Sequence, residues 1–481
     1  MIRLKAFFIS FLFVSVISVT VAQQKGSPSD SVSQLIDGFL KKANWNAVYD
    51  LTDSSFQRMV PRQAFAQQFL SLQQTAWGNY DSLQFAREQN RTQVYKIYFN
   101  EFKGMLLITR NQQQKIEGFA IRPYAELGNE RTIQTNNPLL TLLDKKTDSL
   151  VRAHIKRSYT VGMSIGIYDQ DGFTFYGYGE TIKGNQQIPG NTHLFEIGSI
   201  SKTFTGWLLA QEVLKGTIHL DSPINRYLPD SIAEMVFNNK PITVKSLSNH
   251  TSGIPSLPMN FAVMPGYTAS DPYAGYSREM LFSYLTKFRP FQEPDKQLRY
   301  SNMAVGILGN ILELKTASSY EELVRKRIAQ PLKMNYTGLT QKQYDGMQAL
   351  QTACYDGVGN KAGRWHFQAM RAAGSLYSNT TDLLLYAKAL TETTQTAALY
   401  QSLELSLQPT FTSNATTKIG LGWFLNTRKG NQYVSHSGGT GGYRSVLIVD
   451  RTNKRAVVIL NNVANDVTEL GFQLMDLLNA K

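Results

Sequence analysis

The feature that most constrains this chain is a lysine near the start of an otherwise uncharged helix. The stretch FEIGSISKTFTGWLLA, residues 195–210, is apolar and uncharged from Thr203 to Ala210, which predicts a buried helix. Lys202 would enter this helix about one turn from its start. Burying a lysine is costly unless its charge is paired or suppressed. We therefore expect a functional reason for a lysine at this position.

A serine three residues earlier supplies such a reason. Ser199 and Lys202 share one face of a helix because residues three apart are neighbours on its surface. A serine hydroxyl is a weak nucleophile until a base takes its proton, and a desolvated lysine with a lowered pKa can be that base. The helix N-terminus also favours negative charge developing beside Ser199. So short a motif also arises by chance, so the prediction needs further elements.

A second candidate element is RYSNMAVGILG, at the start of another apolar helix. A Tyr300 hydroxyl near a lysine would pass the serine proton to a leaving group, and Asn302 would hold both the lysine and a substrate amide. The alternative is ordinary helix capping by Ser301 and Asn302.

A third candidate element is YVSHSGGTGGYRS, in which a strand runs into glycines. Glycines let a substrate backbone lie against a strand edge, here at His436, Ser437 and Gly438. The N–H of Gly439, paired with that of Ser199, would form an oxyanion hole. The alternative is a glycine-rich hairpin with a structural histidine.

These three elements, in this order, resemble the motifs of the serine β-lactamase and penicillin-binding-protein superfamily. The Tyr-x-Asn form is similar to the branch of class C β-lactamases and D-alanyl-D-alanine carboxypeptidases. The resemblance covers residues 138–481 and not the part before them. Three further stretches are similar to segments of that family: GTIHLDSPINRYLP, ITVKSLSNHTSGIP and AAGSLYSNTTDLLLYAKAL.

The resemblance implies an acyl-enzyme mechanism without a metal or other cofactor. The serine attacks a carbonyl, the lysine and tyrosine share proton transfer, and the asparagine orients lysine and substrate. Which of the lysine and the tyrosine is the base stays open, because the two would titrate as a coupled pair. The implied catalytic residues are Ser199, Lys202 and Tyr300, and the implied substrate-binding residues are Asn302, His436, Ser437, Gly438 and Gly439.

Two departures from the family pattern bear on the substrate. Class C β-lactamases carry lysine where this chain has His436, which puts strong penicillinase activity in doubt. The carboxypeptidases carry threonine where this chain has Gly439, which removes a hydroxyl for a terminal carboxylate.

We therefore expect a serine hydrolase acting on amide or ester bonds, similar to a D-alanyl-D-alanine carboxypeptidase or β-lactamase, with peptidoglycan peptides among its substrates. An esterase or a D-amino-acid peptidase of the same fold is the alternative. A non-catalytic sensor of cell-wall fragments is an alternative of another class, although it would have no reason to keep every side chain needed for acylation.

The domain organisation follows from shifts in pattern along the chain. Residues 1–22 resemble a cleaved signal peptide, positive and then apolar, which predicts export to the periplasm or beyond without a lasting membrane span; an uncleaved anchor is the alternative. Residues 30–123 place helical patterns before short strand-like runs, which predicts a small α+β domain similar in order to nuclear-transport-factor-like modules. A linker is expected at 124–137 and the hydrolase domain at 138–481.

Within the hydrolase domain we expect an antiparallel sheet flanked by helices, with a helical insertion. A hairpin turning at residues 169–172 and strands between residues 432 and 462 would supply the sheet from both ends of the region. Helical segments are predicted at 139–155, 276–288, 302–314, 381–390 and 467–478.

Composition narrows the remaining function classes. The formal net charge of +13 becomes +11 when Arg3 and Lys5 leave with the signal peptide, which favours anionic surroundings such as a cell envelope. Basic runs typical of nucleic-acid binding are absent from the sequence. The single Cys354 permits no internal disulfide, the six histidines show no metal-ligand spacing, and Ser164, in a Gly-x-Ser-x-Gly pattern, lies in a predicted strand rather than a nucleophile elbow. We expect neither metal nor nucleic acid; the oligomeric state is left open.

Overall fold

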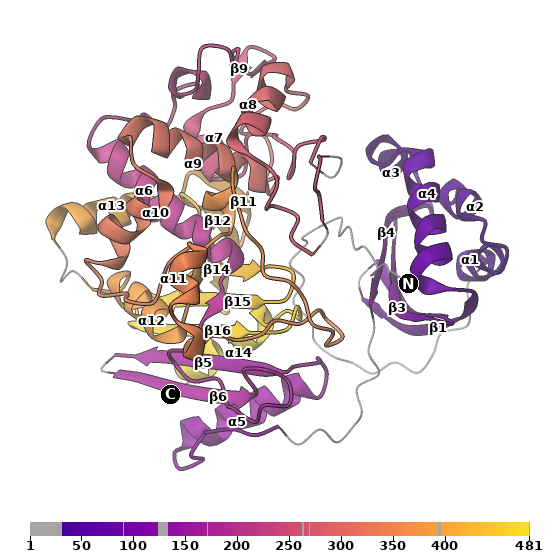
Figure 1. Cartoon of the computed structure of the whole chain (residues 1–481), viewed down its shortest axis with the longest axis horizontal. Coiled ribbons are helices and arrows are strands. Elements are labelled where there is room, and N and C mark those ends of the chain that lie inside the picture. The colour runs from indigo at the N-terminus through magenta and orange to yellow at the C-terminus, as the bar shows by residue number, and fades with distance from the viewer. Residues whose placement is uncertain are drawn as a thin grey trace. The chain divides into compact units, whose positions relative to one another are not determined.

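The computed structural model divides into two compact units, residues 1–126 and 127–481, each considered by itself (Figure 1). It describes residues 31–89, 91–123, 133–170, 172–261, 264–268, 270–392 and 396–480. The predicted signal peptide, residues 1–22, lies outside the described residues. No helix in the part that is described is long and apolar enough to cross a membrane.

The first unit places helices before a four-stranded antiparallel sheet. Its elements are α1 (Ser31–Lys41), α2 (Trp45–Asp50), α3 (Ser54–Met59), α4 (Arg62–Leu72), the π-helical turn η1 (Gln73–Trp77), β1 (Tyr80–Gln89), β2 (Thr92–Phe99), β3 (Phe102–Arg110) and β4 (Ile116–Pro123). The strands pair in chain order. Aromatic rings dominate the core, where Trp77 stacks on Phe102 with ring centroids 4.8 Å apart. This unit has the small α+β arrangement predicted from the sequence.

The second unit is built on an eight-stranded antiparallel sheet with the order β11-β12-β13-β14-β15-β16-β5-β6. Because β16 pairs with β5, the first hairpin and the last strands of the region share one sheet. The predicted antiparallel sheet is therefore confirmed. The strands are β5 (Gly162–Asp169), β6 (Gly172–Gly179), β11 (Phe411–Asn414), β12 (Thr417–Ile419), β13 (Phe424–Arg428), β14 (Asn431–Gly439), β15 (Arg444–Asp450) and β16 (Arg455–Asn461).

Both faces of the central strands are covered, which explains why they read as continuous apolar runs. In β16, Val457 and Ile459 pack toward α5 (Leu142–Ile155) and α14 (Thr468–Asn479). Their neighbours Val458 and Leu460 belong to the larger core on the opposite face, because successive strand residues point to opposite sides.

The helical insertion between β6 and β11 builds the larger core and carries most of the expected motifs. Its helices are α6 (Ser201–Leu214), α7 (Val244–Ser248), α8 (Arg278–Lys287), α9 (Asn302–Thr316), α10 (Tyr320–Val324), α11 (Gln341–Asp345), α12 (Thr380–Ala389) and α13 (Ala397–Leu407). Shorter pieces are β7 (Phe195–Glu196) paired with β10 (Tyr377–Ser378), β8 (Val236–Phe237) paired with β9 (Lys240–Pro241), and the helical turns η2 (Gly198–Ile200), η3 (Ile224–Tyr227), η4 (Arg325–Ala329), η5 (Gln348–Leu350) and η6 (Arg371–Ala373).

Candidate active site

Ser199 lies in a short turn between a strand and a buried helix. The chain leaves β7, makes the 3₁₀ turn η2 and continues directly into α6. Ser199 is partly exposed, whereas its neighbours Gly198 and Ile200 are buried. The sequence places a reactive hydroxyl where solvent and substrate reach it, at the end of a helix held in the core.

Lys202 is fully buried and has three oxygen neighbours. Its Nζ lies 2.9 Å from Ser199 Oγ, 2.7 Å from Asn302 Oδ1 and 2.6 Å from the Ala373 carbonyl oxygen. Burial holds the pKa of Lys202 well below its ordinary value, which favours the neutral amine. A neutral amine has two N–H groups and one lone pair. The asparagine and carbonyl oxygens accept the two N–H bonds, which leaves the lone pair for the serine hydroxyl, and this is the arrangement that a general base requires.

The second motif combines helix capping with contacts to Lys202. Ser301 is the N-cap of α9 and accepts the Ala304 N–H at 2.9 Å, so this part of the capping alternative is correct. Asn302 faces the lysine amine, and the ring centroid of Tyr300 lies 4.8 Å from that nitrogen. Burial raises the pKa of the Tyr300 hydroxyl, while a hydrogen bond with Ser199 acts in the opposite direction. A phenol with a raised pKa keeps its proton at neutral pH, so Tyr300 enters the reaction protonated.

The third motif lies on β14 and brings a neutral histidine to the site. His436 is buried and its Nδ1 lies 2.6 Å from the Ser437 carbonyl oxygen, so this nitrogen carries the proton. Burial is the main cause that lowers the pKa of His436 to about 3. The side chain therefore supplies no positive charge at neutral pH. Ser437 is exposed and Gly439 is partly exposed, so both are accessible to a substrate.

The nucleophile turn and the third motif approach each other through their glycines. Gly198 has φ +51°, and a Cβ built on it would lie 2.5 Å from the backbone nitrogen of Gly439. Only a residue without a side chain permits this approach. The backbone at Ser199 and Gly439 is thereby brought together, as an oxyanion hole requires.

We expect Gly198→Ala to lower the rate of acylation about 100-fold, because the added methyl pushes the Gly439 amide away from the nucleophile. The measurement is kcat/KM for an acyl substrate. The matched control is Gly216→Ala, which has a similar φ of +72° but open space at the Cβ position. Equal rates for the two folded variants would contradict the assignment of this close approach to catalysis.

Three residues near the site were not singled out as functional from sequence. The His250 ring is tilted against that of Tyr300 with ring centroids 4.3 Å apart, and its Nδ1 accepts the Ser301 N–H at 3.2 Å. Tyr273 lies in residues 270–277, which we call the pocket wall, and accepts a hydrogen bond from Asn302 Nδ2 at 3.1 Å. Glu196, three residues before the nucleophile, is buried with a raised pKa. The sequence signal that could have identified Glu196 is its position between two apolar residues, Phe195 and Ile197.

The rival nucleophiles occupy structural positions. Ser164 lies inside β5 and donates to the Gly190 carbonyl oxygen at 3.1 Å. Cys354 is buried, and burial raises the pKa of its thiol to about 12, which leaves it unreactive at neutral pH. Among the described residues, no group of three or more His, Cys, Asp or Glu side chains is placed to hold a metal ion.

Comparison with known proteins agrees with this geometry. The Beta-lactamase family model matches residues 147–478, more than half of the sequence. The chain belongs to the Beta-lactamase family. It is a serine hydrolase of the β-lactamase and penicillin-binding-protein type.

Individual relatives of this Beta-lactamase-family hydrolase are distant. The D-alanyl-D-alanine-carboxypeptidase/endopeptidase AmpH of Escherichia coli K12 is 30% identical over 184 residues, 38% of this chain and 46% of the relative. A beta-lactamase of Pseudomonas fluorescens is 26% identical over 280 residues, 57% and 72% of the two chains. The chain thus spans about half the length of AmpH in their match.

Solved structures show the same fold for the hydrolase. The beta-lactamase/D-alanine carboxypeptidase from Pseudomonas syringae superposes with a TM-score of 0.62 at 21% identity, covering 71% of this chain and 99% of that chain. A class C beta-lactamase gives a TM-score of 0.61 at 20% identity over 69% of this chain and 96% of that chain. The predicted fold class is confirmed.

Proposed function

We propose that this hydrolase removes the C-terminal residue from peptides ending in a D-amino acid, through an acyl-enzyme on Ser199. The observation that carries the proposal is the buried Lys202 amine, whose Nζ lies 2.9 Å from Ser199 Oγ and also has the Asn302 and Ala373 oxygens as acceptors. This arrangement activates a serine toward a carbonyl carbon.

The proposed proton transfers balance in each half of the reaction. Lys202 takes the Ser199 proton as Oγ bonds to the substrate carbonyl carbon, and the backbone N–H groups of Ser199 and Gly439 bind the oxyanion. Tyr300 gives its proton to the leaving amine as the acyl-enzyme forms, and Lys202 returns a proton to Tyr300. Water then repeats the sequence in reverse as nucleophile, releasing the acid and the free serine.

The third motif has a cation beside it that suits a carboxylate-bearing substrate. A Cβ built at Gly439 would lie 2.8 Å from Arg444 Nη1, so a guanidinium lies beside the position of the missing hydroxyl. A guanidinium is well suited to a terminal carboxylate. The neutral His436 supplies no charge of the kind that lysine provides in class C enzymes, which supports weak turnover of lactams.

The same neutral His436 favours a second candidate, an esterase acting on uncharged acyl esters. Because His436 is neutral, a substrate without a carboxylate can bind beside it without leaving a buried cation unpaired.

We would test the function by incubating the purified protein with a fluorescent penicillin and a fluorophosphonate, following adducts by intact mass beside Ser199→Ala. Adducts on the wild type alone are expected. A panel of D-Ala-D-Ala peptides, nitrocefin-type lactams and short acyl esters then ranks kcat/KM, with the peptide expected first. No adduct on folded wild-type protein would overturn the catalytic proposal and favour the sensor.

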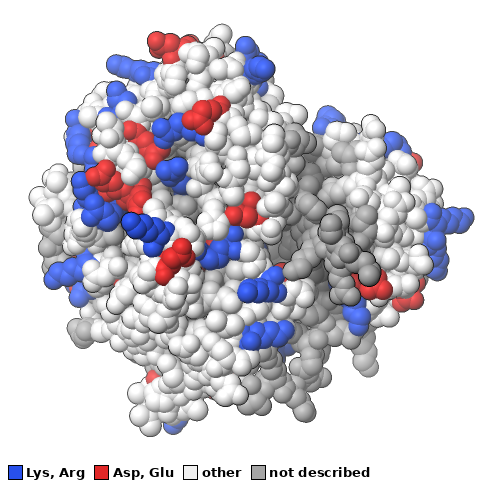
Figure 2. All heavy atoms as spheres, in the orientation of Figure 1, with Lys and Arg blue, Asp and Glu red and all other residues white. Residues whose placement is uncertain are grey.

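We further propose export to the bacterial periplasm or beyond, where such peptides occur. On the face drawn in Figure 2, Lys and Arg side chains alternate with Asp and Glu rather than forming one basic surface. The face drawn therefore lacks the continuous basic surface that is typical of nucleic-acid binding.

A further inference from the structure

The carboxamide of Asn302 has a defined orientation in the site. Its Oδ1 accepts from Lys202 Nζ at 2.7 Å, and its Nδ2 donates to the Tyr273 hydroxyl at 3.1 Å. An amide turned by 180° would point N–H groups at the lysine and a carbonyl oxygen at the tyrosine. In the orientation present, the lysine meets the amide oxygen and the Tyr273 hydroxyl accepts from the amide nitrogen.

Tyr273 is held by packing that leaves its ring little freedom. It is 4% exposed and stacks on Phe367 with ring centroids 4.3 Å apart and an interplanar angle of 23°. Phe261 packs edge-on at 5.1 Å. Burial raises the pKa of the Tyr273 hydroxyl to about 12, so the hydroxyl is neutral at and around neutral pH.

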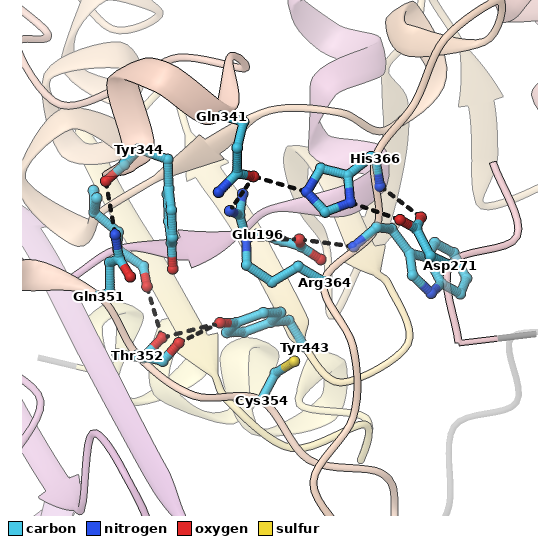
Figure 3. A network of polar contacts seen from close by, with 12 residues as sticks. Glu196, Asp271, Gln341, Tyr344, Gln351, Thr352, Cys354, Arg364, His366 and Tyr443 are labelled. Carbon is cyan, nitrogen blue, oxygen red and sulfur yellow. Dashed lines mark hydrogen bonds and ion pairs between the residues drawn. The ribbon is translucent and has the colours of Figure 1, made fainter. Parts of the chain in front are cut away.

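The segment carrying Phe367 is fixed from two sides (Figure 3). Glu196 accepts the Trp365 backbone N–H at 3.0 Å and pairs with Arg364 at 3.2 Å. His366 Nδ1 lies 2.6 Å from Asp271 Oδ2, and Asp271 accepts the His366 backbone N–H at 2.7 Å. Asp271 is two residues before Tyr273, and Glu196 lies in β7, the strand before Ser199. The contacts of Glu196 and Asp271 with the 364–366 segment therefore tie the pocket wall to this strand.

We propose that Tyr273 is a positioning residue that selects the catalytic orientation of the Asn302 carboxamide. The inference rests on the proposed acyl-enzyme function and acts through Asn302 rather than on substrate. Its consequence is that the wall of the pocket, and not only the three motifs, keeps the Lys202 lone pair directed at Ser199.

Loss of the Tyr273 hydroxyl has a defined effect on Lys202. Without this acceptor, Asn302 Nδ2 gains by turning toward the lysine. N–H groups facing Lys202 disfavour its charged form and lower its pKa further. A base with a lower pKa stays unprotonated to lower pH, so the acid limb of the pH–rate profile moves to more acidic pH. The weaker base and the misplaced lone pair slow acylation.

The test compares Tyr273→Phe with Tyr276→Phe across the pH profile of kcat/KM for a substrate that labels Ser199. Tyr276 is a matched control, because it lies in the same wall, is equally buried and bonds Asn260 at 2.8 Å. We expect Tyr273→Phe to be about 10-fold slower at its optimum with an acid limb at lower pH, and Tyr276→Phe to match the wild type.

The outcomes separate this inference from the function on which it rests. An unmoved acid limb in Tyr273→Phe, or the same change in both variants, overturns the positioning role even if thermal melting shows lost stability. A wild type labelled at Ser199 whose rate equals that of Tyr273→Phe overturns this inference alone. A folded wild type inert to every acylating probe overturns both.

Discussion

Replacing Lys202 with methionine should slow acylation of Ser199 about 10⁴-fold, at the upper end of what a general base contributes. Methionine fills a similar volume but has no lone pair for the Ser199 proton. The two oxygens that accept the lysine N–H groups, on Asn302 and Ala373, would lose these partners. Single-turnover labelling with a fluorophosphonate measures the effect directly.

The matched control is Lys215→Met, the same substitution just beyond the C-terminal end of α6. Lys215 is half exposed and pairs with Glu212 at 2.9 Å. Its replacement should leave the labelling rate unchanged. A Lys202→Met protein that labels at the wild-type rate would show that another group removes the serine proton.

The same substitution should change how stability depends on pH. Because the pKa of Lys202 is lowered by burial, the unfolded chain binds a proton at neutral pH that the folded chain does not. The free energy of unfolding therefore rises with pH up to the ordinary lysine pKa of about 10.4, by at most about 1.4 kcal/mol per pH unit from this group. Urea unfolding at several pH values should show a flatter dependence in Lys202→Met. An identical slope would mean that Lys202 stays charged in the folded protein.

Replacing Tyr300 with phenylalanine should slow amide hydrolysis about 10³-fold while slowing an activated phenyl ester less than about 10-fold. Burial raises the pKa of the Tyr300 hydroxyl, so it carries its proton at neutral pH, as the proposed donor must. An amine leaving group needs that proton, whereas an activated phenolate leaves without it. Parallel kcat/KM measurements on the two substrates give the ratio.

Tyr320→Phe is the control for this experiment, since Tyr320 is buried and its hydroxyl lies 2.8 Å from the Thr205 hydroxyl and bonds the Ser201 carbonyl oxygen rather than the Ser199 side chain. An equal loss on amide and ester in Tyr300→Phe would instead assign the tyrosine as the base that activates Ser199. The experiment thereby decides the choice between Lys202 and Tyr300 that the sequence leaves open.

Helices and strands were predicted correctly where the apolar residues of a single segment show a helical or strand-like pattern. The helix expected at 302–314 is α9 (Asn302–Thr316), and the strands expected between 432 and 462 are β14 to β16. The strand β1 (Tyr80–Gln89) was not predicted. Among the described strands it lies at the sheet edge beside β2, so it needs no continuous apolar run. Its sequence YDSLQFAREQ carries too many polar residues for a strand signal.

The amino-acid sequence by itself determined the family and the order of the three motifs. It also showed that a buried Lys202 needs its charge paired or suppressed. Short motifs are visible because each lies within one turn or one strand. Only the tertiary structure added the Ala373 carbonyl and the Tyr273 hydroxyl to the Asn302 contact that the second motif predicted. Ala373 lies 171 positions from the lysine and acts through its backbone, and Tyr273 belongs to none of the three motifs, so no side-chain pattern marks either residue. Burial then lowers the pKa of the amine, a property of the packed core rather than of any segment.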